Sequence, residues 1–186
     1  MNAFAKVDKA AFLRFAAARA GERYEFVRGR IVQQMTGGTR EHGAVARRIT
    51  RMIEDQIDST QWWVLNERGV STSETVRYAD IVVEPADEPR GSLATMRPAL
   101  IVEVLSPSTS AADLDQKPAE YLALASLDAY VIASQDEAAM LVYERGADGT
   151  FPARPREIEG AGEIISLKGR AFDLTLALSE IYRGIV

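Results

Sequence analysis

The chain contains no cysteine, and His42 is the single histidine among its 186 residues. The lack of cysteine excludes disulfides, cysteine-ligated zinc and catalysis by a thiol. One histidine cannot supply a metal centre built from several imidazoles. Lysine is scarce as well, because the chain has only four copies, and Lys117 alone lies between Lys9 and Lys168. Any chemistry of this chain must therefore depend on carboxylates or on lysine, arginine, tyrosine and serine side chains.

Long apolar runs are also missing. No stretch approaches the ~18 consecutive apolar residues of a membrane-spanning helix, and the N-terminus lacks the apolar segment of a secretory signal. We therefore expect a cytoplasmic protein without membrane contacts. A chain of 186 residues, 47% hydrophobic and 26% charged, is long enough to bury one full core. We expect a single domain over residues 1–186.

The chain as a whole has no excess of positive charge. Its formal net charge of −5 argues against a protein that coats nucleic acid without specificity. Arginines nevertheless crowd the first third of the sequence, at positions 14, 19, 23, 28, 30, 40, 47, 48 and 51. This distribution is compatible with an enzyme that acts on DNA, and equally with solvated helix faces. Within it, His42, Arg47 and Arg51 lie largely off the apolar stripe of a helix and are candidates for substrate binding.

The apolar pattern predicts an α/β fold, with one mixed sheet flanked by helices. Helices are expected over residues 9–20, 41–57 and 174–182. A further helix is expected from near Asp115 to residue 127, with Pro118 in its first turn, where a missing N–H is tolerated. Residues 24–34 alternate around Gly29 like a β-hairpin. Other strands are expected over residues 62–66, 71–76, 78–84, 99–105, 129–133, 140–143 and 164–167.

Glu103 is a carboxylate inside the most apolar of these strands. Alternate residues of a strand share a face, so Glu103 shares its face with the aliphatic Ile101 and Leu105. A buried carboxylate costs several kcal/mol unless a cation, a metal ion or water compensates its charge. Polar residues follow at the C-terminal end of this strand, where ligands of α/β sheets bind. Lys117, at the start of the next helix, is expected to point back over that end.

Asp80 lies in another apolar strand, 23 positions before Glu103. If the two strands are neighbours, both acids can converge on one point. Two hard oxygen ligands with open positions suit Mg²⁺ or Mn²⁺, which bind through one or two carboxylates together with water and substrate phosphate. A nearby lysine would orient the attacking water and stabilise the charge that builds on a phosphate. Asp80, Glu103 and Lys117 therefore have the composition of a site for phosphodiester hydrolysis.

The sequence around these residues resembles the Uma2 family, which is grouped with the PD-(D/E)XK restriction-endonuclease-like superfamily. The most specific part is the run IVEVLSPS at residues 101–108, preceded by Asp80 and followed by Lys117 and Tyr121. Residues 24–43 and 172–182 are also similar to the family, so the resemblance covers nearly the whole chain. It implies a central mixed sheet flanked by helices and a metal-dependent nuclease site.

By position, this resemblance implies that Asp80 and Glu103 are metal ligands and that Glu25 is a third acid. The sequence departs from the superfamily pattern at two positions. The proline before the first aspartate is Ala79 here, and the lysine two residues after the glutamate is Leu105. The Uma2 pattern itself lacks that strand lysine, and the resemblance implies that a helix lysine, here Lys117, takes its place.

Some candidates have a purely structural alternative. For Glu25 it is a surface ion pair with Arg28 or Arg30 across the hairpin. For Trp62 and Trp63 we favour a role as core or interface aromatics over a role as platforms on which bases stack.

Three functions are compatible with these residues. The first is a Mg²⁺- or Mn²⁺-dependent DNA endonuclease that hydrolyses phosphodiester bonds with a metal-activated water. The second is a catalytically inactive nuclease fold that binds DNA or protein. The third is a carboxylate enzyme such as a glycosidase with Glu103 as the acid, although sugar-stacking aromatics are missing near either acid. A nuclease that cuts both strands needs two sites, so we expect a two-fold homodimer.

Overall fold

The structure is a computed structural model that describes residues 7–19, 21–34, 38–105 and 111–186. The helices in these residues are α1 (Lys9–Ala17), α2 (Arg40–Glu54), α3 (Ala111–Tyr121) and α4 (Leu178–Ile181). The strands are β1 (Tyr24–Val27), β2 (Arg30–Gln33), β3 (Trp62–Ser71), β4 (Thr75–Pro85), β5 (Ala94–Thr95), β6 (Leu100–Leu105), β7 (Ala129–Ser134), β8 (Ala139–Glu144), β9 (Arg156–Glu159), β10 (Ile164–Lys168) and β11 (Asp173–Ala177). None of the described helices is long and apolar enough to cross a membrane.

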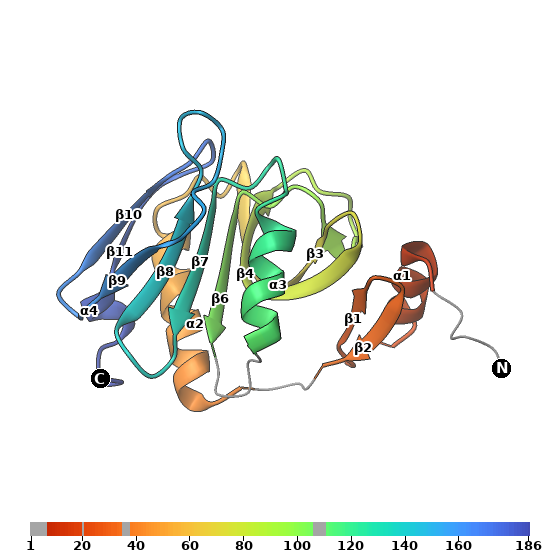
Figure 1. Cartoon of the computed structure of the whole chain (residues 1–186), viewed down its shortest axis with the longest axis horizontal. Helices are drawn as coiled ribbons and strands as arrows, with labels where there is room; N and C mark the ends of the chain where they lie inside the picture. Colours follow the sequence, from red (N-terminus) through yellow and green to blue (C-terminus); the bar gives the residue numbers. More distant parts are fainter. Residues whose placement is uncertain (1–6, 20, 35–37, 106–110) are drawn as a thin grey trace.

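Nine of the described strands form one mixed sheet, whose main path is β2-β1-β4-β6-β7-β8-β9. Strand β3 pairs with the other edge of β4, and β5 pairs with β3. Helix α3 covers one face of this sheet (Figure 1). Helices α2 and α4 and the small β10–β11 sheet cover the other face (Figure 1). The predicted fold class, a mixed sheet flanked by helices, is confirmed.

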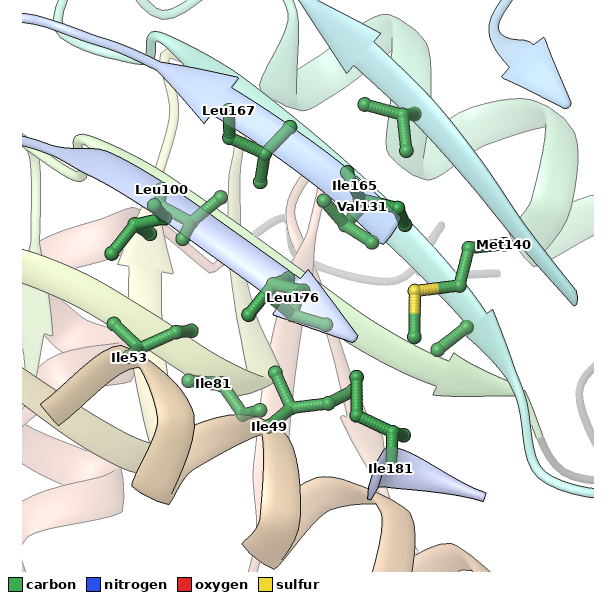
Figure 2. Packing of buried hydrophobic residues seen from close by; sticks show 14 of the residues in the cluster. Ile49, Ile53, Ile81, Leu100, Val131, Met140, Ile165, Leu167, Leu176 and Ile181 are labelled. Carbon is green, nitrogen blue, oxygen red and sulfur yellow. The ribbon is translucent and has the colours of Figure 1, made fainter. Parts of the chain in front are cut away.

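The larger core lies between the sheet and the layer formed by α2, α4, β10 and β11. Ile49 and Ile53, one turn apart on α2, pack in this core with Ile81 of β4, Leu100 of β6 and Leu176 of β11 (Figure 2). All five side chains are fully buried. Each contributes about 1.5–3 kcal/mol by burial. This packing holds α2 against the sheet and therefore fixes the position of the polar residues on its other side.

Two strands share one edge of β4 and leave part of that edge open. Strand β3 pairs with the opposite edge of β4 over most of its length. On the shared edge, β1 pairs with Thr75 and Val76, and β6 pairs with residues 81–83. Residues 77–80 lie between these two ladders. Opposite Asp80 in β3, Glu67 has a left-handed backbone with φ of +53°, so the regular ladder is also distorted there. The sheet therefore splits at the C-terminal half of β6.

Two helix predictions are corrected by the structure. Residues 173–177 form β11 rather than the beginning of a closing helix, because Leu174 and Leu176 are buried while Asp173 and Thr175 are exposed, which is a two-residue period. Helix α3 begins at residue 111, earlier than expected, and ends at residue 121 rather than 127. Pro118 therefore lies inside the helix and not in its first turn.

The strand limits also differ in places. The strand expected over residues 71–76 is interrupted at residues 72–74 by a turn between β3 and β4, in which Thr72 N donates to Thr75 O at 3.0 Å. Strand β9, over residues 156–159, was not predicted. The hairpin at residues 24–33 is confirmed, and Arg28 and Gly29 at its tip both have positive φ, as a tight hairpin turn requires.

Candidate active site

The split in the sheet opens into a cleft of about 960 Å³. It lies between the β1–β2 hairpin, α2 and α3. Every site residue expected from the sequence lines this cleft: Glu25, His42, Arg47, Arg51, Asp80, Glu103 and Lys117. These residues come from five different elements, so only the folded chain brings them together.

Asp80 and Glu103 occupy corresponding positions on neighbouring strands. Strands β4 and β6 are antiparallel and pair Ile81 with Val102, so the next step in the same register sets Asp80 opposite Glu103. The main-chain pairing of β4 with β6 ends at Ile81 and Val102. Beyond it, the Asp80 side chain takes the place of a main-chain acceptor. Its Oδ2 accepts a hydrogen bond from the Val104 amide at 2.7 Å. The expectation that the two acid-bearing strands are neighbours is confirmed.

Glu103 is buried, with 7% of its surface exposed, and its Oε1 accepts two hydrogen bonds. Lys117 Nζ donates at 2.9 Å and the Tyr121 hydroxyl at 3.3 Å. Burial raises the pKa of Glu103 to about 7, while the positive charge of Lys117 acts in the opposite direction. Burial tends to lower the pKa of Lys117, but the charge of Glu103 and their hydrogen bond raise it overall. The strand carboxylate thus has a helix ammonium as its partner.

His42 lies on the first turn of α2 and faces Asp80. Thr39 caps this helix, because its hydroxyl accepts a hydrogen bond from the His42 amide at 3.1 Å. The imidazole Nε2 is 3.4 Å from Asp80 Oδ1, and this interaction raises the pKa of His42. The other ring nitrogen, Nδ1, is buried and has no hydrogen-bond partner among the described residues.

Arg47 and Arg51 project from α2 into the same cleft, one helical turn apart. Both side chains are exposed. They lie about 6 Å apart along the helix axis, because the helix rises 1.5 Å per residue. Neither has an ion-pair partner within the described part of the chain. Two cations in such an arrangement can contact a polyanion without first losing a partner within the protein.

Glu25 is buried and is not the surface pair with Arg28 or Arg30 that was the alternative from the sequence. Its Oε2 accepts hydrogen bonds from Arg77 at 3.2 Å and from Gln34 at 3.1 Å, and its Oε1 accepts one from the Tyr78 amide at 3.1 Å. Glu25 therefore accepts a hydrogen bond from a main-chain amide in the open part of β4, as Asp80 does from the Val104 amide of β6.

The remaining aromatic candidates lie apart from the two acids. Trp62 is partly buried against the larger core, and Trp63 is 52% exposed. They line a smaller pocket together with the end of α2. Sequence reasoning did not identify Arg77 and Glu120, the buried ion pair beneath the cleft. Arg77 pairs with Glu25, 52 positions earlier, and with Glu120, 43 positions later. No local sequence pattern shows pairing over such separations.

The described residues contain no group of three or more histidine, aspartate and glutamate side chains that could hold a metal ion. Any metal in this cleft would therefore have at most two protein carboxylates from these residues. Such a site depends on water and substrate oxygens for its other ligands, which is how Mg²⁺ usually binds in nucleotide- and phosphate-handling enzymes.

Comparisons with known proteins identify the family of this chain. The model of the Uma2 family, whose description is "putative restriction endonuclease", matches residues 10–179. The chain belongs to the Uma2 family. This membership covers every residue of the cleft described above, and it confirms the resemblance seen in the sequence.

Two curated relatives of this Uma2 protein come from Synechocystis sp. (strain ATCC 27184 / PCC 6803 / Kazusa). The uncharacterized protein slr1290 is 28% identical over 171 residues, which are 90% of this chain and 87% of the relative. The uncharacterized protein sll1609 is 29% identical over 123 residues, which are 63% of this chain and 69% of the relative. Neither name states an activity.

A solved structure with the same fold is that of "a putative nuclease belonging to DUF820" from Anabaena variabilis ATCC 29413. The TM-score is 0.71, with 16% identity, over 88% of this chain and 91% of that chain. At this identity the likeness shows the fold alone. The description of the Uma2 family supports a nuclease, and restriction-endonuclease-like proteins generally use divalent metals.

Proposed function

We propose that this Uma2 protein is a divalent-metal-dependent endonuclease that hydrolyses phosphodiester bonds of DNA. One observation carries the proposal. Asp80 and Glu103 face each other across the split between β4 and β6, and Lys117 donates to Glu103 at 2.9 Å. Two acids and a cation in this arrangement suit metal-assisted phosphodiester hydrolysis.

The two acids fit a hard cation such as Mg²⁺ or Mn²⁺. Both offer carboxylate oxygens, the ligand type that these ions prefer. Asp80 Oδ2 is held by the Val104 amide, so the orientation of the carboxylate is fixed before any ligand arrives. A bound divalent cation would supply positive charge to the phosphate oxygens and would make a coordinated water more acidic.

The other residues of the cleft have separate roles in this proposal. Lys117 provides a positive charge beside Glu103 that stabilises the negative charge developing on the phosphate. His42 holds a proton next to Asp80 and is the nearest candidate to donate it to a leaving oxygen. Glu25 is already engaged by three donors, so we assign it a positioning role rather than that of a third metal ligand.

DNA as the substrate is supported by where the positive charge lies. Residues 1–51 contain 11 lysines and arginines against four acidic residues, whereas the whole chain carries −5. This basic third of the sequence includes α2 and the hairpin, which form two walls of the cleft. We assign Arg47 and Arg51 to the backbone phosphates of the substrate. The acidic remainder of the chain would repel nucleic acid elsewhere.

The absence of a lysine two residues after Glu103 does not favour the inactive alternative. Leu105 occupies that position, but Lys117 brings an ammonium to the same carboxylate from α3. The site therefore has a cation that comes from a helix instead of from the strand.

The proposal is tested by cleavage of supercoiled plasmid with Mg²⁺, with Mn²⁺ and with EDTA, using the wild-type protein, Asp80→Asn and Glu103→Gln. We expect metal-dependent nicking by the wild type and at least about a 100-fold loss in each variant. Linear product at early times would support the two-fold dimer that we propose for cutting both strands. Equal cleavage by the wild type and both variants, or cleavage that survives EDTA, would contradict the proposal.

A further inference from the structure

A buried ion network lies directly beneath the cleft and joins three elements. Arg77 of β4 is only 4% exposed and lies between Glu25 of β1 and Glu120 of α3. Arg77 belongs to the open part of β4, three positions before Asp80. Glu120 lies on α3, three positions after Lys117. The network therefore connects the strand that carries one acid with the helix that carries the lysine.

The contact between Arg77 and Glu120 has two points. Arg77 Nε donates to Oε2 of Glu120 at 2.9 Å, and Nη2 donates to Oε1 at 3.1 Å. The Thr75 hydroxyl adds a third hydrogen bond to Oε2 at 3.2 Å. A planar fork of this kind fixes both the distance and the relative rotation of the groups that it joins. It therefore fixes how α3 is turned about its own axis over the sheet.

Stability alone does not account for this network. A buried ion pair is often no more stabilising than apolar side chains of the same size, because both charges lose their water. Precise placement of α3, in contrast, has an evident use. The helix contains Pro118, which has no N–H to donate within it, directly after Lys117. An anchor at Glu120 holds the helix two residues beyond this weak point.

We propose that Arg77 and Glu120 are positioning residues, whose buried ion pair sets the rotation of α3 and thereby holds Lys117 Nζ against Glu103. This inference rests on the proposed function, because it assigns the network to the nuclease site. Neither residue touches the substrate. They act through Lys117, and Glu25 orients the Arg77 fork from the other side.

The first test compares the steady-state kinetics of Glu120→Gln with those of Glu84→Gln. Glu84 is a matched control, because it is 2% exposed, lies on β4 and pairs with Arg68 at 2.9 Å, but does not line the cleft. We expect Glu120→Gln to lower kcat about 10- to 100-fold, the effect of a displacement of about 1 Å at a reacting centre. KM should stay unchanged, because Arg47 and Arg51 lie on α2. Glu84→Gln should keep the wild-type kcat.

A second measurement does not depend on cleavage. Brief acetylation with acetic anhydride, followed by mass spectrometry, gives the ratio of reaction at Lys117 to reaction at Lys168. In the wild type this ratio should be low, because the Lys117 side chain is 17% exposed and that of Lys168 is 75% exposed. In Glu120→Gln the ratio should rise severalfold, and in Glu84→Gln it should not. Arg77→Lys, which keeps the charge but loses the fork, should behave like Glu120→Gln and replaces it if that variant does not fold.

The inference is overturned if Glu120→Gln and Glu84→Gln give the same labelling ratio and the same kcat. If the wild type shows no cleavage, the proposed function fails, and the labelling ratio still decides whether the ion pair positions Lys117.

Discussion

Lys117 Nζ lies 2.9 Å from Glu103 Oε1, although one residue belongs to a helix and the other to a strand 14 positions earlier. The pair sits where β4 and β6 separate, beside the Asp80 carboxylate. A charged pair at this depth needs both partners, since a single buried charge is costly. This relationship gives the site a pH-dependent stability as well as a chemical role.

Replacing Lys117 by methionine should destabilise the protein more at high pH than at low pH. Lys117 lowers the pKa of Glu103, which burial has raised to about 7, so the substitution raises that pKa further. An acid whose pKa is raised in the folded state favours folding at low pH, and that contribution is lost as the pH rises through its folded pKa. We expect a loss of about 3 kcal/mol at pH 9 and less than about 1 kcal/mol at pH 5.

Denaturant unfolding of Lys117→Met at the two pH values measures this difference. Lys168→Met, at an exposed position, is the control and should change little at either pH. A Lys117→Met variant equally destabilised at pH 5 and pH 9 would show that Glu103 does not depend on Lys117 for its charge.

Because His42 is the single histidine of the chain, its titration can be followed without assignment. The hydrogen bond to Asp80 raises the pKa of His42 above its usual 6.5. In Asp80→Asn this pKa should fall below the wild-type value, since the amide has no charge and only the attraction of Glu103 and Glu67 then opposes the effect of partial burial. The measurement is an NMR pH titration of the imidazole protons. The same pKa in both proteins would mean that His42 and Asp80 are not in contact in solution.

Arg47 and Arg51 should contribute to DNA affinity through salt-dependent phosphate contacts. Each substitution by alanine should reduce the slope of log affinity against log salt concentration by about 1, without a change in kcat at saturating substrate. Arg14→Ala provides a control, because Arg14 is exposed on α1 and does not line the cleft. The slopes are measured by fluorescence anisotropy. Unchanged slopes for both cleft variants would show that Arg47 and Arg51 of α2 do not contact the nucleic acid.

Thr39→Ala should cost about 1 kcal/mol of stability through loss of the helix cap. The Thr39 hydroxyl accepts from the His42 amide at 3.1 Å and is also 3.0 Å from Gln135 Oε1, to which it donates. Thr39→Ser keeps both bonds and should stay close to the wild type in stability, because serine caps helices at least as well as threonine. Thermal unfolding of both variants makes the comparison, and equal losses would argue that the methyl group, rather than the cap, matters.

Much of the central sheet could be predicted from the sequence, because its strands follow a strong apolar pattern. Residues 100–105 are apolar except for Glu103, and this pattern identifies a buried strand without any long-range information. The alternation of residues 24–34 around Gly29 likewise predicted the hairpin. The meeting of Asp80 and Glu103 followed from the family resemblance and from the assumption that their strands are neighbours, which the structure confirms.

Other features depended on contacts that local pattern does not encode. Leu174, Leu178 and Ile181 have helical spacing, whereas Leu174 and Leu176 alternate with polar residues as in a strand. The choice of β11 is made by packing in the larger core. For α3, proline chemistry suggested that Pro118 marks the first turn. In the structure, ion pairs at Lys117 and Glu120 flank Pro118, and this tertiary context outweighs the local preference.

The most direct test of the account is a crystal of the protein soaked in Mn²⁺ and measured at the manganese absorption edge. The account predicts one anomalous peak in the cleft within about 2.2 Å of a carboxylate oxygen of Asp80 and of Glu103, which disappears in Asp80→Asn. No peak between these two carboxylates at a Mn²⁺ concentration that saturates cleavage, or a peak that persists in Asp80→Asn, would contradict it.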